Sequence, residues 1–137
     1  MASESELIAA LSAVFNLSDA NVRENVLIGI GDDGAVIAPS SRKSVLAADM
    51  AIEGIHFNRK WSTLREIGAK ITAANLADIY AMGGDPKYLL VSAGLTADFG
   101  ITEITELAQG IAEEAALVGA SVAVSYTHLT LPTKRIV

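Results

Sequence analysis

The sequence predicts an α+β domain with a mixed, mostly antiparallel sheet and helices on one face of that sheet. Helix-like and strand-like segments both occur, and strands stand before and between the helices. At 137 residues the chain has room for one domain. Because 51% of the residues are hydrophobic and only 5% are aromatic, a core can form, and it must be built mainly from Ala, Val, Ile and Leu.

Helices are expected over three segments, residues 3–15, 63–82 and 101–118. In each of them apolar residues recur at helical spacing. The first two open with the capping-box pattern, a serine or threonine followed three residues later by glutamate. Gly83 and Gly119 are expected to end the two longer helices. We expect the helices 63–82 and 101–118 to cover one face of the sheet.

Strands are expected at residues 26–30, 35–38, 44–50 and 87–95, and again from Ser121 onward. The first two flank the tight acidic turn Gly31–Gly34, and residues 39–43 form a second turn.

Composition and charge exclude several classes of protein. A net charge of −6 argues against a broad nucleic-acid surface. The absence of cysteine excludes disulfides and thiolate metal sites. No apolar run approaches the roughly 20 residues that a membrane span needs, and the acidic start lacks a signal-peptide pattern. We therefore expect a cytoplasmic protein without membrane or nucleic-acid partners, which can bind an anionic nucleotide only with divalent cations or local basic groups.

Four aspartates are candidate metal ligands: Asp32, Asp33, Asp49 and Asp78. Mg²⁺ prefers oxygen ligands, commonly a few carboxylates with water and phosphate. Structural alternatives stay open for each position. The Gly-Asp-Asp-Gly run is also an ordinary turn, Asp49 can cap a strand end, and Asp78 can be a solvated residue on the helix face that it shares with Asn75.

The second group of candidates surrounds His56, one of two histidines in the chain. Its imidazole can bind a phosphate or a substrate hydroxyl, although a histidine in an Ile-His-Phe run is more often structural. Arg59, Lys60 and Trp61 add positive charge and one aromatic ring, and a solvated loop is the default interpretation there.

Three segments together resemble the thiamine-monophosphate kinase family. They are IGIGDDGAV (28–36), ADMAIEGIHF (48–57) and KITAANLADIYAMGGDP (70–86). The resemblance covers roughly residues 4–124 and places the chain in the wider superfamily of aminoimidazole ribonucleotide synthetase. It implies that this N-terminal domain binds ATP and Mg²⁺, dimerises through its sheet, and serves the transfer of the γ-phosphoryl group of ATP to thiamine monophosphate.

By the same resemblance, Asp33, Asp49 and Asp78 are Mg²⁺ ligands with Asp32 adjacent, and His56 is at the position that touches the thiamine substrate. The family usually has two hydroxyl residues before the strand-end aspartate, whereas this chain has Ala47 and Ala48. A hydroxyl ligand is therefore missing there. Two alternatives remain: another enzyme of the superfamily, of the aminoimidazole ribonucleotide synthetase or selenophosphate synthetase type, or a non-catalytic fragment that only dimerises.

The C-terminal residues differ from what the family predicts. A strand leading into a Gly-Gly-Asp-Thr-like nucleotide motif is expected after Val122, but the chain reads VSYTHLTLPT from Val124. This run resembles the translation of a sequencing adapter, so we interpret residues 1–124 as the domain and 125–137 as a non-native tail. The tail is expected to pack poorly, although Tyr126, Leu129 and Leu131 alternate as a strand captured by an exposed sheet would require.

Overall fold

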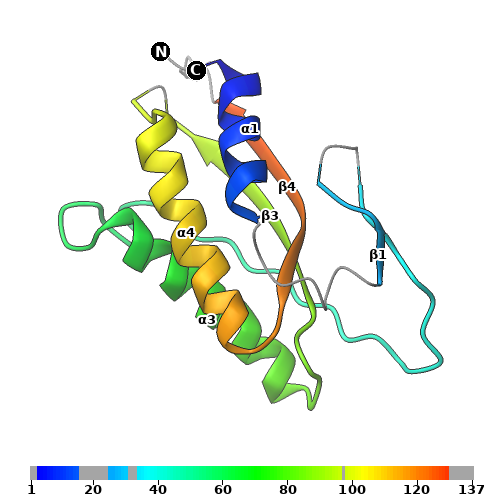
Figure 1. Cartoon of the computed structure of the whole chain (residues 1–137). Coiled ribbons are helices and arrows are strands. Elements are labelled where there is room, and N and C mark those ends of the chain that lie inside the picture. Colours follow the sequence, from blue (N-terminus) through cyan, green and yellow to red (C-terminus); the bar gives the residue numbers. More distant parts are fainter. Residues whose placement is uncertain (1–2, 16–24, 31–33, 97, 130–137) are drawn as a thin grey trace, which may run out of the picture.

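The computed structural model describes residues 3–15, 25–30, 34–96 and 98–129. The elements are α1 (Glu4–Phe15), β1 (Val26–Ile28), β2 (Val36–Ile37), α3 (Leu64–Ala81), β3 (Tyr88–Leu95), α4 (Ile101–Leu117) and β4 (Ser121–Leu129). The predicted α+β class is confirmed (Figure 1). The predicted acidic turn at Asp32 and Asp33 lies outside the described residues.

The helix boundaries follow the local sequence. Thr63 caps α3 through a complete capping box with Glu66, as predicted. At α1, the Glu6 N–H donates to Ser3 Oγ at 3.3 Å, and the Ser3 N–H donates back to the Glu6 carboxylate at 2.7 Å. Gly119 follows α4 with a φ of 68°, a left-handed conformation that glycine adopts without steric cost.

The longer strand pair corrects the expectation of a mostly antiparallel sheet. β3 and β4 pair in parallel from Tyr88↔Ser121 to Leu95↔Leu129, with an irregularity after Leu89. The physical reason is the connection: α4 carries the chain back to the starting edge, so β4 runs in the same direction as β3. Only the short β1–β2 pair is antiparallel among the described strands.

The hydrophobic core lies between the helices and one face of the β3–β4 pair. α1 and α4 contact β4, and α3 packs mainly against α4 (Figure 1). Complete burial of a large aliphatic side chain contributes about 1.5–3 kcal/mol to folding. The largest fully buried side chains come one from each helix: Leu7, Ile67 and Ile104.

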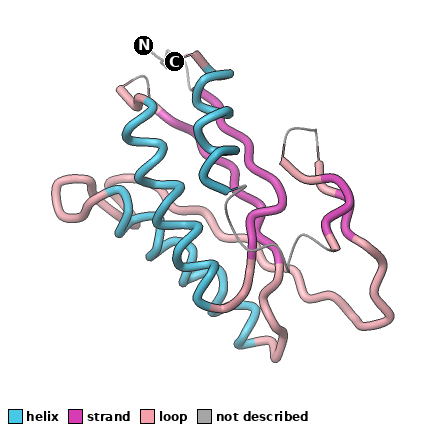
Figure 2. The backbone as a smooth tube through the Cα atoms, in the orientation of Figure 1, coloured by secondary structure: helices cyan, strands magenta, loops and turns pink. Residues whose placement is uncertain are grey.

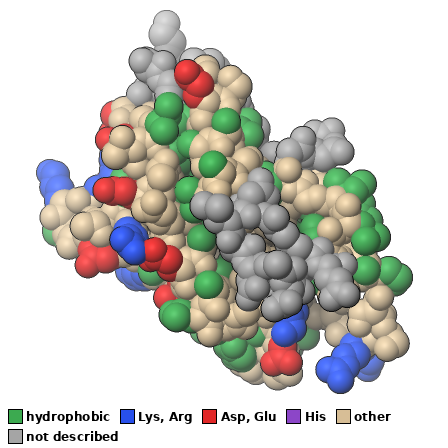
Figure 3. Space-filling model, viewed as in Figure 1, with side chains coloured by type: hydrophobic (Ala, Val, Ile, Leu, Met, Phe, Trp, Pro, Cys, Tyr) green, Lys and Arg blue, Asp and Glu red, His purple; other side chains and the backbone are tan. Residues whose placement is uncertain are grey.

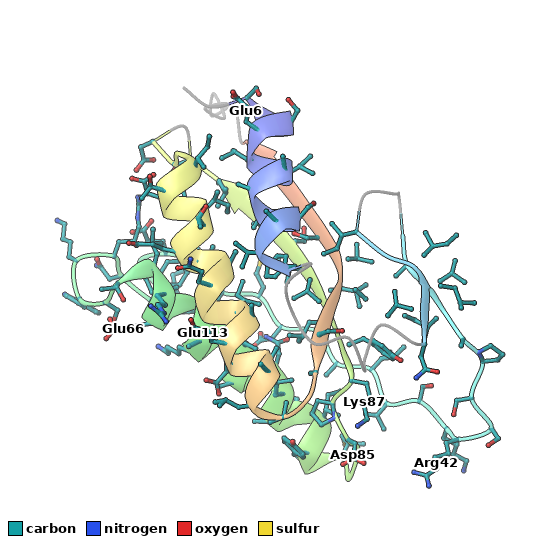
Figure 4. All side chains as sticks on the ribbon, in the orientation of Figure 1. Glu6, Arg42, Glu66, Asp85, Lys87 and Glu113 are labelled. Atoms are coloured by element: carbon teal, nitrogen blue, oxygen red, sulfur yellow. The ribbon has the colours of Figure 1, made fainter. Side chains whose placement is uncertain are left out.

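Two glycines allow α3 and α4 to pack closely. A Cβ atom on Gly110 would lie 1.9 Å from the Arg65 carbonyl oxygen, and one on Gly68 would lie 2.3 Å from the Leu107 carbonyl oxygen. An ion pair closes the same interface, where Arg65 donates to both carboxylate oxygens of Glu113 at 2.5 and 2.8 Å. Figure 4 shows Glu113 on α4 beside α3.

The predicted strand at residues 44–50 is wrong. Residues 43–50 are exposed and form neither helix nor strand, and they belong to a long loop between β2 and α3 (Figure 2). A strand needs a neighbouring strand to accept its amide hydrogen bonds. Here the amides of Asp49 and Met50 donate instead to side-chain oxygens, those of Asn75 and Asp49 respectively.

The segment interpreted as a tail is partly ordered. β4 continues through residues 125–129, whose backbone pairs with Val91–Leu95 of β3. These residues are extended, and their pairing agrees with the alternative of a strand captured by the exposed sheet, whereas the expected poor packing of the tail stays a prediction. Ser125 Oγ is buried and has no hydrogen-bond partner among the described residues. Residues 130–137 lie outside the described part. No helix in the described part is both long and apolar enough to cross a membrane.

Candidate functional site

Asp49 is held beside α3. Its N–H donates a hydrogen bond of 3.2 Å to Asn75 Oδ1, and Asn75 Nδ2 in turn donates to the Ile71 carbonyl at 3.0 Å. Asn75 therefore connects the loop to the helix backbone. Asp78 stands one helical turn further along α3, on the same face as Asn75.

The carboxylates of Asp49 and Asp78 are both exposed to solvent. Together with the amide oxygen of Asn75 they supply the oxygen donors that suit Mg²⁺. Within the described ranges, no group of three or more acidic, histidine or cysteine side chains lies close enough to hold a metal ion. Asp32 and Asp33 are outside those ranges, so the predicted convergence of Asp33, Asp49 and Asp78 stays a prediction.

The His56 turn, residues 52–59, holds its histidine in one orientation. The Ile52 N–H donates to His56 Nδ1 at 3.0 Å, and Lys70 of α3 donates to the His56 carbonyl at 2.9 Å. A neutral imidazole that accepts at Nδ1 carries its proton on Nε2. His56 therefore offers an Nε2–H donor to a ligand.

A pocket of about 170 Å³ separates the His56 turn from the first half of α3. Its lining combines a histidine, two aromatic rings, a lysine and a glutamate with backbone atoms of the turn. Trp61, at the rim, is 83% exposed, so its indole face is open to a planar ring. The lining residues are Gly54, Ile55, His56, Phe57, Asn58, Trp61, Ser62, Glu66, Ile67 and Lys70.

Arg59 ties the His56 turn to the start of α4. Its Nε donates to both carboxylate oxygens of Glu53 at 2.8 and 3.0 Å, and its Nη1 donates to Asp98 Oδ2 at 2.8 Å. Its guanidinium also lies 4.8 Å from the centre of the Phe99 ring. The hydrogen bonds from Arg59 lower the pKa of Glu53, whereas the pKa of Asp98 is lowered first by the Thr96 hydroxyl and then by Arg59.

Sequence reasoning treated Arg59, Lys60 and Trp61 alike as a solvated loop. The structure confirms exposure for Lys60 and Trp61 but not for Arg59, which is half-buried and has three partners. Glu53, six residues earlier, was the one local signal that could have suggested an ion pair. Asp98 is 39 residues away, and no local pattern links it to Arg59.

A comparison with protein families matches residues 31–135 to the family described as "AIR synthase related protein, N-terminal domain". This match covers most of the chain and includes Asp49, His56, Asn75 and Asp78. The chain belongs to the AIR synthase related protein family. The α+β fold is therefore that of a domain of this family.

The chain is also similar to curated thiamine-monophosphate kinases. It is 36% identical to the enzyme of Mycobacterium tuberculosis (strain CDC 1551 / Oshkosh) over 97 residues, which are 71% of this chain and 29% of that enzyme. It is 37% identical to the enzyme of Bacillus subtilis (strain 168) over 94 residues, which are 68% of this chain and 29% of that enzyme. The matched region thus spans less than a third of these relatives.

A solved structure agrees with this similarity. The crystal structure of thiamine-monophosphate kinase from Stenotrophomonas maltophilia K279a superposes with a TM-score of 0.68 at 26% identity. The superposition covers 90% of this chain and 38% of that chain.

Proposed function

We propose that this chain is the N-terminal, nucleotide- and metal-handling part of a thiamine-monophosphate kinase. The reaction is transfer of the γ-phosphoryl group of ATP to thiamine monophosphate, which yields thiamine diphosphate. The observation that carries the proposal is the similarity to thiamine-monophosphate kinases of several bacteria over about two thirds of the chain. The family description favours a second candidate, an aminoimidazole ribonucleotide synthetase, but the relatives' names favour the kinase.

In this proposal the aspartates hold Mg²⁺ and the His56 turn binds thiamine monophosphate. Asp49 and Asp78, with Asp32 and Asp33, supply carboxylate oxygens to the ion. Bound Mg²⁺ neutralises the charge of the triphosphate, which an acidic chain could not otherwise approach. Asn75 keeps Asp49 beside α3, and His56 donates from Nε2 to the substrate. Catalysis then rests on the positioning of two anionic substrates.

We also infer that the domain forms a homodimer. Large apolar side chains of β1, β2 and the following loop are exposed to an extent that is unusual for a monomer surface. Figure 3 shows hydrophobic side chains gathered over this hairpin. Leu46 is 89% exposed, and the other members are Leu27, Ile28, Val36, Ile37 and Val45.

The proposed location of the protein is the cytoplasm.

The domain itself is proposed to be residues 1–124, with residues 125–137 as a non-native tail; the family match extends to residue 135 and so does not mark this boundary. The backbone pairing of residues 125–129 does not oppose this boundary, because ladder hydrogen bonds join main-chain groups and need no particular side chains. The unpartnered hydroxyl of Ser125 supports it, because buried polar groups that are selected for their place are normally hydrogen-bonded.

A chimera tests the proposed activity. Residues 1–122 of this chain replace the matching N-terminal part of the Mycobacterium tuberculosis enzyme, and thiamine diphosphate formation is measured with ATP and Mg²⁺. We expect product from the chimera and none without ATP. A folded chimera that forms no thiamine diphosphate would contradict the kinase proposal and leave the synthetase as the remaining candidate.

A further inference from the structure

Arg59 holds together the two ends of the His56 turn. Glu53 opens the turn and receives both hydrogen bonds from Arg59 Nε. The backbone closes the same turn, because the Gly54 N–H donates to the Phe57 carbonyl at 2.8 Å and Glu53 pairs with Phe57 as an isolated bridge. Without Arg59 the turn would keep its backbone hydrogen bonds, which include those from the Ile55 and His56 N–H groups to the Ile52 carbonyl at 3.2 and 2.9 Å, and the bond from Lys70, but no side-chain link to the start of α4.

The same guanidinium anchors the turn to the rigid part of the domain. Asp98 and Phe99 immediately precede α4, and Phe99 is buried in the main hydrophobic core. An isolated ion pair at the surface contributes little to stability. Arg59, however, joins two carboxylates and a buried aromatic ring through one planar group, and such networks restrict geometry more than a single pair does.

The geometry of His56 depends on this turn. The hydrogen bond from the Ile52 N–H to His56 Nδ1 overlaps the segment that Glu53 and Arg59 close, because His56 lies between these two residues. The backbone bond from the His56 N–H to the Ile52 carbonyl at 2.9 Å does not fix the ring, so a loosened turn lets the imidazole rotate away from the Ile52 N–H and lose the contact that selects its Nε2–H tautomer.

We propose that Arg59 is a positioning residue for His56, which fixes the turn against α4 so that the imidazole presents its Nε2–H to the pocket. This inference rests on the proposed role of His56 in substrate binding. Arg59 itself does not line the pocket and acts only through the turn.

Imidazole ¹⁵N nuclear magnetic resonance on this chain tests the proposal. Spectra are recorded under alkaline conditions in a His128→Gln background, so that His56 is the remaining histidine. In the protein that keeps Arg59, we expect the ¹⁵N shifts of a single Nε2–H tautomer of His56. In Arg59→Gln we expect averaged Nδ1 and Nε2 shifts and amide exchange at Ile52 and Gly54 faster by on the order of tenfold.

The matched control is Arg65→Gln, which removes the same charge and also breaks a two-bond ion pair, the one to Glu113 on α4. It should leave the His56 tautomer and the exchange of the turn unchanged. Arg59→Lys keeps a cation beside Glu53 but cannot reproduce the planar fork, so it should give intermediate shifts.

The proposal is overturned if Arg59→Gln keeps the single tautomer, or if Arg65→Gln changes the His56 signals as much as Arg59→Gln does. Should Arg59→Gln fail to fold, Glu53→Gln and Asp98→Asn must each loosen the turn, and unchanged signals in both would equally overturn it. If the NMR test fails but the chimera forms thiamine diphosphate, the positioning role of Arg59 is refuted and the kinase proposal is not. If the chimera is inactive but Arg59→Gln loses the single His56 tautomer, the kinase proposal is refuted and the positioning role of Arg59 is not.

Discussion

The backbone N–H of Asp49 donates a 3.2 Å hydrogen bond to the side-chain oxygen of Asn75, 26 residues further along the chain. This bond places Asp49, in the middle of the long loop between β2 and α3, beside the helix face that carries Asp78. It also gives the Asp49 N–H a hydrogen-bond acceptor, which would otherwise have to come from a neighbouring strand or from water.

Asn75→Ala should therefore release the Asp49 segment. We expect a loss of about 1 kcal/mol in the free energy of unfolding, the usual net value of one hydrogen bond, and faster exchange of the Asp49 amide. Urea denaturation and hydrogen exchange measure the two effects. Asp78→Asn, one turn away, is the control and should leave the Asp49 amide protected in metal-free protein. Equal exchange in Asn75→Ala and the wild type would contradict the role of this bond.

Gly110→Ala should destabilise the domain. In an open helix this change adds about 0.5–1 kcal/mol of stability, but here the new methyl group meets the Arg65 carbonyl at 1.9 Å. Separation of α3 and α4 should cost roughly 1–3 kcal/mol or more. Thermal unfolding measures the difference. Gln109→Ala, at the exposed neighbouring position, should change stability little, and a stabilised Gly110→Ala would show that the helices are not in close contact.

Acid should weaken the ion pair of Glu53 with Arg59. The pKa of Glu53 is lowered in the folded state, chiefly by hydrogen bonds from Arg59, so its contribution is present above the unfolded value of about 4.3. It is lost as the pH falls through the lowered folded value. The melting temperature of Glu53→Gln should thus lie below that of the wild type at neutral pH and approach it in acid.

The matched control for this pH series is Glu114→Gln. Glu114 makes none of the ion pairs found within the described ranges, so its variant should follow the wild type at every pH. A gap between Glu53→Gln and the wild type that does not narrow in acid would contradict the assigned pair.

Ser125→Ala should not destabilise the chain. Its hydroxyl is buried without a partner in the described structure. Its removal therefore relieves a desolvation cost of about 1–3 kcal/mol. Chemical denaturation compares it with Ser92→Ala, an exposed serine on β3 that should be neutral. A clear loss of stability would show that the hydroxyl is used, which would argue against residues 125–137 being non-native.

Asp49→Asn in the active chimera should lower kcat by about 100-fold or more. Mutating a residue that only hydrogen-bonds to a metal ligand typically costs about 10–100-fold, and loss of a ligating charge should cost more. His56→Gln should instead act mainly on KM for thiamine monophosphate. Steady-state kinetics at saturating Mg²⁺ separate the two. An unchanged kcat in Asp49→Asn would remove Asp49 from the metal site.

Local sequence determined the helices of this protein and their ends. Thr63 with Glu66 starts α3, and Gly119 stops α4, because capping and left-handed turns depend on residues only a few positions apart. The same local logic located β3 and the start of β4. It also located Asp49, His56 and Asp78 as candidates, since each stands in a motif that can be read without the fold.

Tertiary structure decided what depends on distant partners. Residues 44–50 have the apolar pattern of a strand, but a strand exists only where another strand accepts its hydrogen bonds, and here Asn75 accepts one of them instead. The direction of β4 was set by the crossover through α4 and not by its own residues. Arg59 has the sequence context of a solvated loop, yet Asp98 and Phe99, brought beside it by the packing of α4, make it the link between the His56 turn and the core.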